Sequence, residues 1–372
     1  GADLNVWDWF KTALDDNVSN LKKEHCFISA KLGAMEAIKS GTTTILDFNY
    51  PHPTGFLVDE CFDAFSSVGI RSIVARAIID QGKAHPQIIN DPEREINDCI
   101  RLLEKYNQND NDMEHVWLAP YTIFSTSLQT YKRIIKLANK FDTFVTIHAS
   151  TPSTIEESKV LYGMKDIEFL YSQNLLANNV LAAHCTSDID KSVLDILKEC
   201  DVKISHNPAS NCYLGEGIAP IAEMLDHGLS VGLGTDGPAS NNNHDMIFII
   251  KLTALLQKVK YLKPEVISAE TVLKLATIEG AKCVGLENIV GSLEIGKKAD
   301  IAIFDLSSLN TVTLHDPIKS IVYSSNQNNV SDVLINGKLI LKGKQFIEQN
   351  ENDIIATAQS LGEELVKNLD VS

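Results

Sequence analysis

Short apolar or β-branched runs alternate with longer amphipathic segments along most of the chain. The segments between the runs carry apolar residues at helical spacing; in 128–140, for example, Tyr131, Ile134 and Leu137 can share one helix face. Strands that alternate with helices of this length are typical of a largely parallel α/β sheet. The runs predicted to be strands are 43–48, 71–77, 115–119, 143–148, 179–184, 202–206 and 230–236.

From about Ile289 the pattern changes to short strands punctuated by glycines. Asn336-Gly337 stands between two alternating runs, which is a strong signal for a β-hairpin. Residues 6–23 and 353–368 have the pattern of helices. We therefore predict three parts: a barrel over 1–288, a β-sandwich portion over 289–350 and a C-terminal helix over 351–372.

Seven parallel strands are one too few for a closed barrel of the TIM type, which has eight strands and no exposed edge. We predict a TIM-type (β/α)8 barrel with a small β-sandwich domain at the C-terminus. The first barrel strand is missing from this chain and is expected before Gly1, in keeping with a sequence that begins without Met.

The composition narrows the possible partners. Among 372 residues, 44% are hydrophobic, which is enough for a sizeable core, and 49 acidic against 33 basic residues give a net charge of −16. This charge disfavours nucleic acid and anionic membranes as partners. No apolar run approaches the roughly 18 residues of a membrane-spanning helix. Seven scattered cysteines without a Cys-x-x-Cys pair indicate reduced thiols and a cytoplasmic protein, and they argue against a thiolate zinc site.

Three of the predicted strands end in histidine, at His148, His184 and His206, and a fourth ends in Asp236. In a parallel barrel the carboxyl ends of the strands meet at one mouth, where active sites are built. Imidazole and carboxylate are ligands that zinc or iron accepts, and such an ion lowers the pKa of a bound water toward 7. The pattern therefore predicts metal-assisted hydrolysis.

Each of these residues also has a structural interpretation. A single histidine at a strand end is more often a hydrogen-bonded structural residue than a ligand. His206 precedes Asn207-Pro208 and could cap a turn, and Asp236 precedes Gly237 and could belong to a tight loop. Arg76, inside the second predicted strand, could reach a substrate anion, although pairing with a core carboxylate is favoured.

Several segments resemble the amidohydrolase superfamily, in its branch of S-adenosylhomocysteine and methylthioadenosine deaminases, guanine deaminase-like enzymes and triazine hydrolases. The resemblance is carried by 205–211 (SHNPASN), 217–220 (GIAP), 232–242 (GLGTDGPASNN) and 291–301 (GSLEIGKKADI). It implies an enzyme that hydrolyses a carbon–nitrogen bond other than a peptide bond. Activated water would add to a carbon of a nitrogen heterocycle and release an amino or related group.

The same resemblance assigns roles by position. It implies that His148 and Asp236 are metal ligands, that Asp236 also accepts a proton, and that His184 ligates the metal or orients the water. Thr151 and His206 are expected to contact the substrate. A divalent metal is implied, with zinc favoured over iron or manganese, together with a small heterocyclic substrate and a homo-oligomer.

The chain departs from the family pattern in two places. It has no His-x-His pair, which the family carries on its first strand, so we expect that pair upstream with the missing strand. Thr151 stands where the family commonly has glutamate, and a threonine hydroxyl cannot carry a proton near neutral pH. Glu156 or Glu157 could supply the carboxyl group from the following loop, but a role as solvated residues at a helix start is favoured for both.

These departures leave a second interpretation open: a catalytically impaired or non-catalytic barrel of this family that binds a small heterocycle or a protein partner. A third interpretation, an unrelated phosphate-binding barrel enzyme, is disfavoured because Asp236 would repel a phosphate there. Leu118 also stands where the family's deaminases usually have a substrate-contacting histidine.

Overall fold

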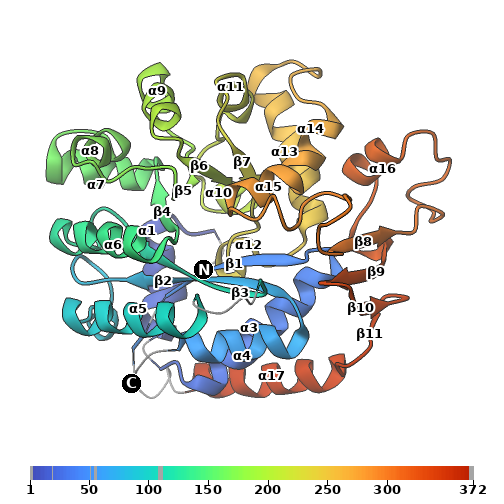
Figure 1. Cartoon of the computed structure of the whole chain (residues 1–372), viewed down its shortest axis with the longest axis horizontal. Coiled ribbons are helices and arrows are strands. Elements are labelled where there is room, and N and C mark those ends of the chain that lie inside the picture. The colour runs from blue at the N-terminus through green and yellow to red at the C-terminus, as the bar shows by residue number, and fades with distance from the viewer. Residues whose placement is uncertain (1–2, 19, 51, 54–56, 108–111, 368–372) are drawn as a thin grey trace. The chain divides into compact units, whose positions relative to one another are not determined.

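The computed structural model describes residues 3–18, 20–50, 52–53, 57–107 and 112–367. In this part of the chain seven parallel strands alternate with helices (Figure 1), which confirms the predicted α/β class. Each of the seven predicted runs overlaps one strand. The strands are β1 (Thr44–Asn49), β2 (Arg71–Ile78), β3 (Glu114–Pro120), β4 (Val145–Ala149), β5 (Val180–His184), β6 (Lys203–His206) and β7 (Val231–Leu233).

The chain divides into two compact units. The first unit comprises residues 1–35, 44–147 and 348–372, and the second comprises 36–43 and 148–347. This division does not test the predicted domain boundaries at 288 and 350, which stay predictions. Each unit is described by itself below.

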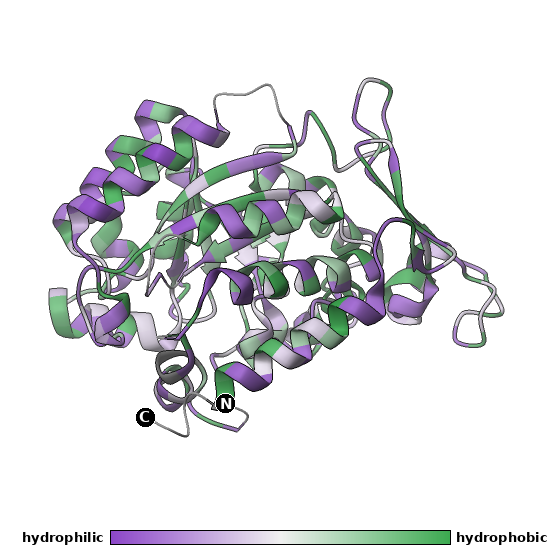
Figure 2. Cartoon of the chain, turned by 90° about the horizontal axis from the view of Figure 1, so that it is seen from below, coloured by the Kyte–Doolittle hydropathy of each residue, from purple (hydrophilic) through white to green (hydrophobic). Residues whose placement is uncertain are grey.

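In the first unit, β1 pairs with β2, β2 with β3, and β3 with β4, all in parallel register. Two of its helices start at side-chain caps: the Asp91 carboxylate accepts the Arg94 N–H, and the Ser127 hydroxyl accepts the Thr130 N–H. The helices carry hydrophobic and hydrophilic residues along their length (Figure 2), as expected where one face packs on a sheet. They are α4 (Val58–Val68), η2 (Pro86–Ile88), α5 (Pro92–Tyr106), α6 (Leu128–Phe141) and α17 (Glu351–Lys367).

The helical structure predicted over 6–23 is confirmed for 6–18, whereas residues 20–22 are not helical. The segment forms α1 (Val6–Trp9), a π-helical turn η1 (Phe10–Asp15) and α2 (Asp16–Val18), and the next helix, α3 (Lys23–Lys39), starts at the predicted end. The Asn17 side chain donates to the Thr12 and Ala13 carbonyls at 3.0 and 3.3 Å. Such a side chain competes for the carbonyls that an α-helix would use, in keeping with the π-helical hydrogen bonding of this segment.

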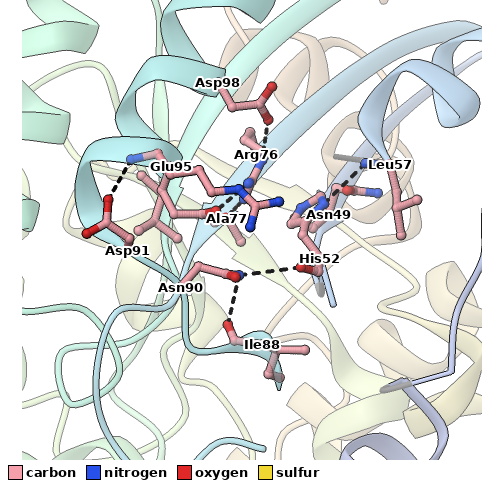
Figure 3. Close-up of polar contacts among 12 residues, drawn as sticks. Asn49, His52, Leu57, Arg76, Ala77, Ile88, Asn90, Asp91, Glu95 and Asp98 are labelled. Atoms are coloured by element: carbon pink, nitrogen blue, oxygen red, sulfur yellow. Dashed lines mark hydrogen bonds and ion pairs between the residues drawn. The ribbon is translucent and has the colours of Figure 1, made fainter. Parts of the chain in front are cut away.

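Arg76 lies buried on β2 in the first unit and binds two carboxylates of α5 (Figure 3). Its Nη2 is 2.7 Å from Glu95 Oε2, and its Nε is 3.1 Å from Asp98 Oδ2. The structural interpretation of Arg76 is therefore supported. Burial together with the nearby guanidinium lowers the pKa of His52, which also lies beside this cluster.

In the second unit, β5 pairs with β6 and β6 with β7 in parallel register. β7 has only three residues, so the loop that carries Asp236 begins earlier than the predicted strand end. The helices of this unit are α7 (Pro152–Tyr162), α8 (Asp166–Ser172), α9 (Lys191–Glu199), α10 (Pro208–Tyr213), α11 (Ile221–Asp226), α12 (Pro238–Asn241), α13 (Met246–Tyr261), α14 (Ala269–Leu275), α15 (Ile278–Cys283), α16 (Pro317–Tyr323) and η3 (Gln327–Asn329).

A separate antiparallel sheet in the second unit has the order β11-β10-β9-β8 (Figure 1). Its strands are β8 (Ile301–Phe304), β9 (Val330–Ile335), β10 (Lys338–Lys342) and β11 (Gln345–Phe346). Asn336 and Gly337 join β9 to β10 with φ of 50° and 79°, and the two-residue hairpin turn of type I′ requires positive φ at both positions. The predicted hairpin is therefore confirmed.

The helices in the described part of the chain include none with the length and apolar content needed to cross a membrane. All seven cysteines are free, as predicted.

Candidate active site

The strand-end residues His148, His184 and Asp236 lie together in the second unit. The rings of His148 and His184 stack with centroids 5.5 Å apart and an interplanar angle of 18°. His184 Nε2 is 3.9 Å from Asp236 Oδ2. Three residues that are far apart in the sequence therefore form one cluster.

The backbone at this cluster is constrained. His184 and Asp236 have φ of 77° and 61°, a left-handed region that residues with a Cβ rarely adopt. Such conformations persist where the surrounding structure holds them, and they occur often at functional sites. At Asp236 the turn brings the Gly237 N–H to 2.6 Å from the carboxylate Oδ1.

Asn211 on α10 sets the tautomer of His184. Its Oδ1 lies 2.8 Å from His184 Nδ1 and can only accept, so Nδ1 carries the hydrogen. In the neutral ring, Nε2 then presents a lone pair toward the Asp236 carboxylate. Two acceptors that face each other at 3.9 Å can be bridged by a proton, a water molecule or a cation.

The Asp236 carboxylate is stabilised in its charged form. Burial acts to raise its pKa, but the His184 ring, the Ser210 hydroxyl and the Gly237 N–H outweigh this effect, so the pKa is lowered. Asp236 is therefore negatively charged at neutral pH.

His206, the last residue of β6, is fully buried, and neither of its ring nitrogens has a hydrogen-bond partner among the described residues. Burial, with a smaller contribution from His184, lowers the pKa of His206 to about 3, so its ring is neutral at physiological pH. An unsatisfied buried polar group costs about 1–3 kcal/mol. A polar ligand or an ion that binds to the ring nitrogens of His206 would explain why they have no partner in the described part of the chain.

Thr151 caps the N-terminus of α7. Its hydroxyl accepts the Thr154 N–H at 3.3 Å and lies 2.9 Å from the Ser153 hydroxyl. The neighbouring Asp166 carboxylate accepts the Ser150 N–H at 2.6 Å and the Thr154 hydroxyl at 2.8 Å. These contacts fix Thr151 in a buried position.

Glu216 belongs to the same surroundings, and the sequence analysis missed it. Its side chain is buried, with only 7% of the residue exposed. Burial raises the pKa of Glu216, against the opposite effects of Thr151, His184 and Ser153. The only signal in the sequence was a single acidic residue between two glycines, Gly215 and Gly217.

The donor types of this cluster fit a borderline divalent cation. Two ligands of one tetrahedral ion, with bonds near 2 Å, lie roughly 3.3–3.5 Å apart. His184 Nε2 and Asp236 Oδ2, at 3.9 Å, lie slightly beyond that spacing and would close by a small movement around an ion. Within the described ranges, no set of three or more histidine, cysteine, aspartate or glutamate side chains has a metal-holding arrangement. The fit therefore rests on this facing pair, with the His148 ring stacked on His184.

Comparisons with known proteins agree with these observations. The model of the amidohydrolase family matches residues 1–340. The chain is 36% identical over 369 residues to a 5′-deoxyadenosine deaminase of Methanobrevibacter smithii, a match that covers 98% of this chain and 81% of the relative. It is 34% identical over 345 residues to a 5-methylthioadenosine/S-adenosylhomocysteine deaminase of Thermococcus onnurineus, covering 92% and 78%.

Solved structures share the fold. An adenosine deaminase from Xanthomonas campestris with bound zinc has a TM-score of 0.91 at 25% identity, covering 99% of this chain and 81% of that one. A mutant of atrazine chlorohydrolase from Arthrobacter aurescens, in complex with zinc and atraton, has a TM-score of 0.91 at 25% identity, covering 96% and 82%. The predicted family resemblance and barrel-type fold are confirmed, and the non-catalytic alternative finds no support in these relatives.

Proposed function

Because this chain belongs to the amidohydrolase family, we propose that it removes the amino group of an adenosine-type nucleoside by hydrolysis. The observation that carries the proposal is the facing pair of His184 Nε2 and Asp236 Oδ2, with His148 stacked on His184. The names of the relatives, deaminases of adenosine derivatives, support this substrate class over a triazine.

A divalent metal ion, with zinc favoured over iron or manganese, is part of the proposal. His148, His184 and Asp236 would hold it, and zinc in two solved relatives supports this assignment. When bound, such an ion makes water acidic enough to supply a hydroxide-like nucleophile near neutral pH.

The side chains around this position have separate tasks in the proposed reaction. Asp236, ionised at neutral pH, accepts a proton from the attacking water. Asn211 holds the His184 ring so that Nε2 faces the Asp236 carboxylate, where the ion would bind. The neutral ring of His206 and the hydroxyl of Thr151 contact the heterocycle, since both are buried polar groups beside the cluster.

Two further properties stay predictions. A cytoplasmic location is supported by seven free thiols, because reduced cysteines are typical of that compartment. The homo-oligomer implied by the family resemblance is tested by light scattering of the purified protein.

The test is ammonia release from adenosine, 5′-deoxyadenosine and methylthioadenosine by the zinc-loaded protein. We expect stoichiometric ammonia and the corresponding 6-oxo product from at least one of them. Asp236→Asn should lower the rate by at least about 100-fold, because a positioned acid–base group contributes 10²–10⁴-fold. Binding of these nucleosides by the metal-loaded protein without any ammonia would contradict the proposal.

A further inference from the structure

Glu216 carries a carboxyl group that is buried in the second unit. Its Oε2 is shielded from solvent and has no hydrogen-bond partner among the described residues. A carboxyl group gains nothing in stability from such a position, because burial disfavours its charge. The protein therefore keeps this group at a cost, and its place beside the His184 cluster makes it a candidate for a functional group.

The backbone holds Glu216 firmly. Gly215 and Gly217, on either side, have φ of 67° and 95° and so form a turn that residues with a Cβ rarely adopt. The Glu216 N–H donates to the Asn211 carbonyl at 2.8 Å. Because the Asn211 side chain also orients His184, one short segment after β6 positions both groups.

The carboxyl of Glu216 lies beside Thr151 and Ser153 and within electrostatic range of His184. Thr151 stands at the position where the family commonly has glutamate. Its hydroxyl is a poor proton carrier near neutral pH, so this site needs a carboxyl group from elsewhere in the chain. Glu156 is exposed to solvent on α7, whereas Glu216 is buried next to Thr151.

We propose that Glu216 is the proton-transfer residue of this active site, so that the carboxyl group absent at position 151 is supplied from the Gly215–Gly217 turn. This inference rests on the proposed deamination. It adds a catalytic residue that neither the strand ends nor the family motifs indicated.

The proton balance of the reaction assigns Glu216 a definite part. As the new carbon–oxygen bond forms, the attacking water gives a proton to Asp236. The electron pair of the C=N bond moves to the ring nitrogen, and protonated Glu216 gives its proton to that nitrogen. In the collapse, the new hydroxyl returns a proton to Glu216, Asp236 protonates the amino group, and the carbon–nitrogen bond breaks. The products are ammonia and the 6-oxo ring, and both carboxyl groups regain their initial states.

The test compares Glu216→Gln with the matched control Glu156→Gln. For Glu216→Gln we expect kcat for ammonia release to fall about 100-fold or more, the usual contribution of a general acid–base group. Nucleoside affinity, measured by calorimetry, should stay within about threefold, since loss of a transition-state interaction lowers kcat rather than binding. Glu156→Gln should match the wild type in both measurements.

A double variant separates a catalytic role from a structural one. In Thr151→Glu combined with Glu216→Gln, the carboxyl group is carried by position 151 instead of position 216. We expect kcat of this variant to be roughly 10-fold higher than that of Glu216→Gln alone. Glu216→Asp, which keeps a carboxyl group, should lose less activity than Glu216→Gln. A structural role would produce neither effect.

The outcomes are distinct. Equal kcat for Glu216→Gln and Glu156→Gln, in a wild type that releases ammonia, would overturn this inference alone. A lowered melting temperature with equal loss of activity in Glu216→Gln and Glu216→Asp, and no recovery in the double variant, would assign Glu216 a structural role. A metal-loaded wild type that releases no ammonia would overturn the proposed function and this inference with it.

Discussion

Two buried acidic clusters in this chain differ in how their charge is compensated. In the first unit, Arg76 binds both Glu95 and Asp98 within 3.1 Å, so the protein supplies its own countercharge (Figure 3). In the second unit, the charged or polar groups that face Asp236 and Glu216 are histidine rings and hydroxyls. The first cluster stabilises the fold with its own ion pairs. The second cluster has polar groups that can bind a ligand.

The contrast shows why burial of a charge does not by itself indicate a function. Arg76 and Asp236 both stood out in the sequence, one in a strand run and one after a strand. Only the partners distinguish these two residues. The cluster around Arg76 satisfies most of its own hydrogen bonds, and Glu95 Oε1 is its atom without a partner among the described residues. At His206 both ring nitrogens lack partners.

The largest expected effect on stability is at Arg76. Arg76→Met would leave the buried Glu95 carboxylate without its ion-pair partner, whereas Asp98 keeps Arg101 at 2.8 Å. Breaking a buried pair of this kind costs about 3–5 kcal/mol. Urea denaturation should show this loss in the free energy of unfolding. The control is Arg133→Met, which removes an exposed pair with Glu93 at 2.7 Å and should cost less than about 1 kcal/mol. Equal losses in the two variants would contradict the assigned structural role.

A smaller effect is expected at Gly217. Its φ of 95° is unfavourable for a residue with a Cβ, so Gly217→Ala should cost about 1–2 kcal/mol and displace the adjacent Glu216. Ammonia release should fall along with the melting temperature. Gly296→Ala is the matched control, because Gly296 has a φ of 99° and open space around its Cβ position. That variant should lose stability while keeping activity; unchanged activity in Gly217→Ala would contradict the positioning role of the turn.

The smallest effect concerns pH. Burial raises the pKa of Glu216 above its unfolded value, so the folded state binds this proton more tightly than the unfolded state does. The contribution of Glu216 to stability is therefore present at low pH and is lost as pH rises from about 4.3, the usual glutamate pKa, through the folded pKa. Glu216→Gln has no such group to ionise. The melting temperature of Glu216→Gln should therefore rise relative to that of the wild type as pH increases through the folded pKa of Glu216. A constant difference would contradict the burial of an ionisable group there.

The sequence predicted most of the strands because each apolar run is long enough to be buried and is bounded by turn residues. It also found His148, His184 and Asp236, since strand ends in a parallel sheet have a common direction. It could not find Glu216, whose surroundings come from Thr151, 65 positions earlier in the chain. The helical pattern of 6–23 did not reveal the π-helical turn at 10–15, which depends on local contacts such as those of the Asn17 side chain with two carbonyls.

The central claim is that His148, His184 and Asp236 hold one divalent ion. Anomalous diffraction at the zinc edge, from crystals of the zinc-loaded protein, tests it most directly. We predict a peak about 2.0–2.2 Å from His184 Nε2, from an Asp236 oxygen and from a ring nitrogen of His148, the usual zinc bond lengths. Bound zinc whose peaks all lie away from these three residues would contradict it.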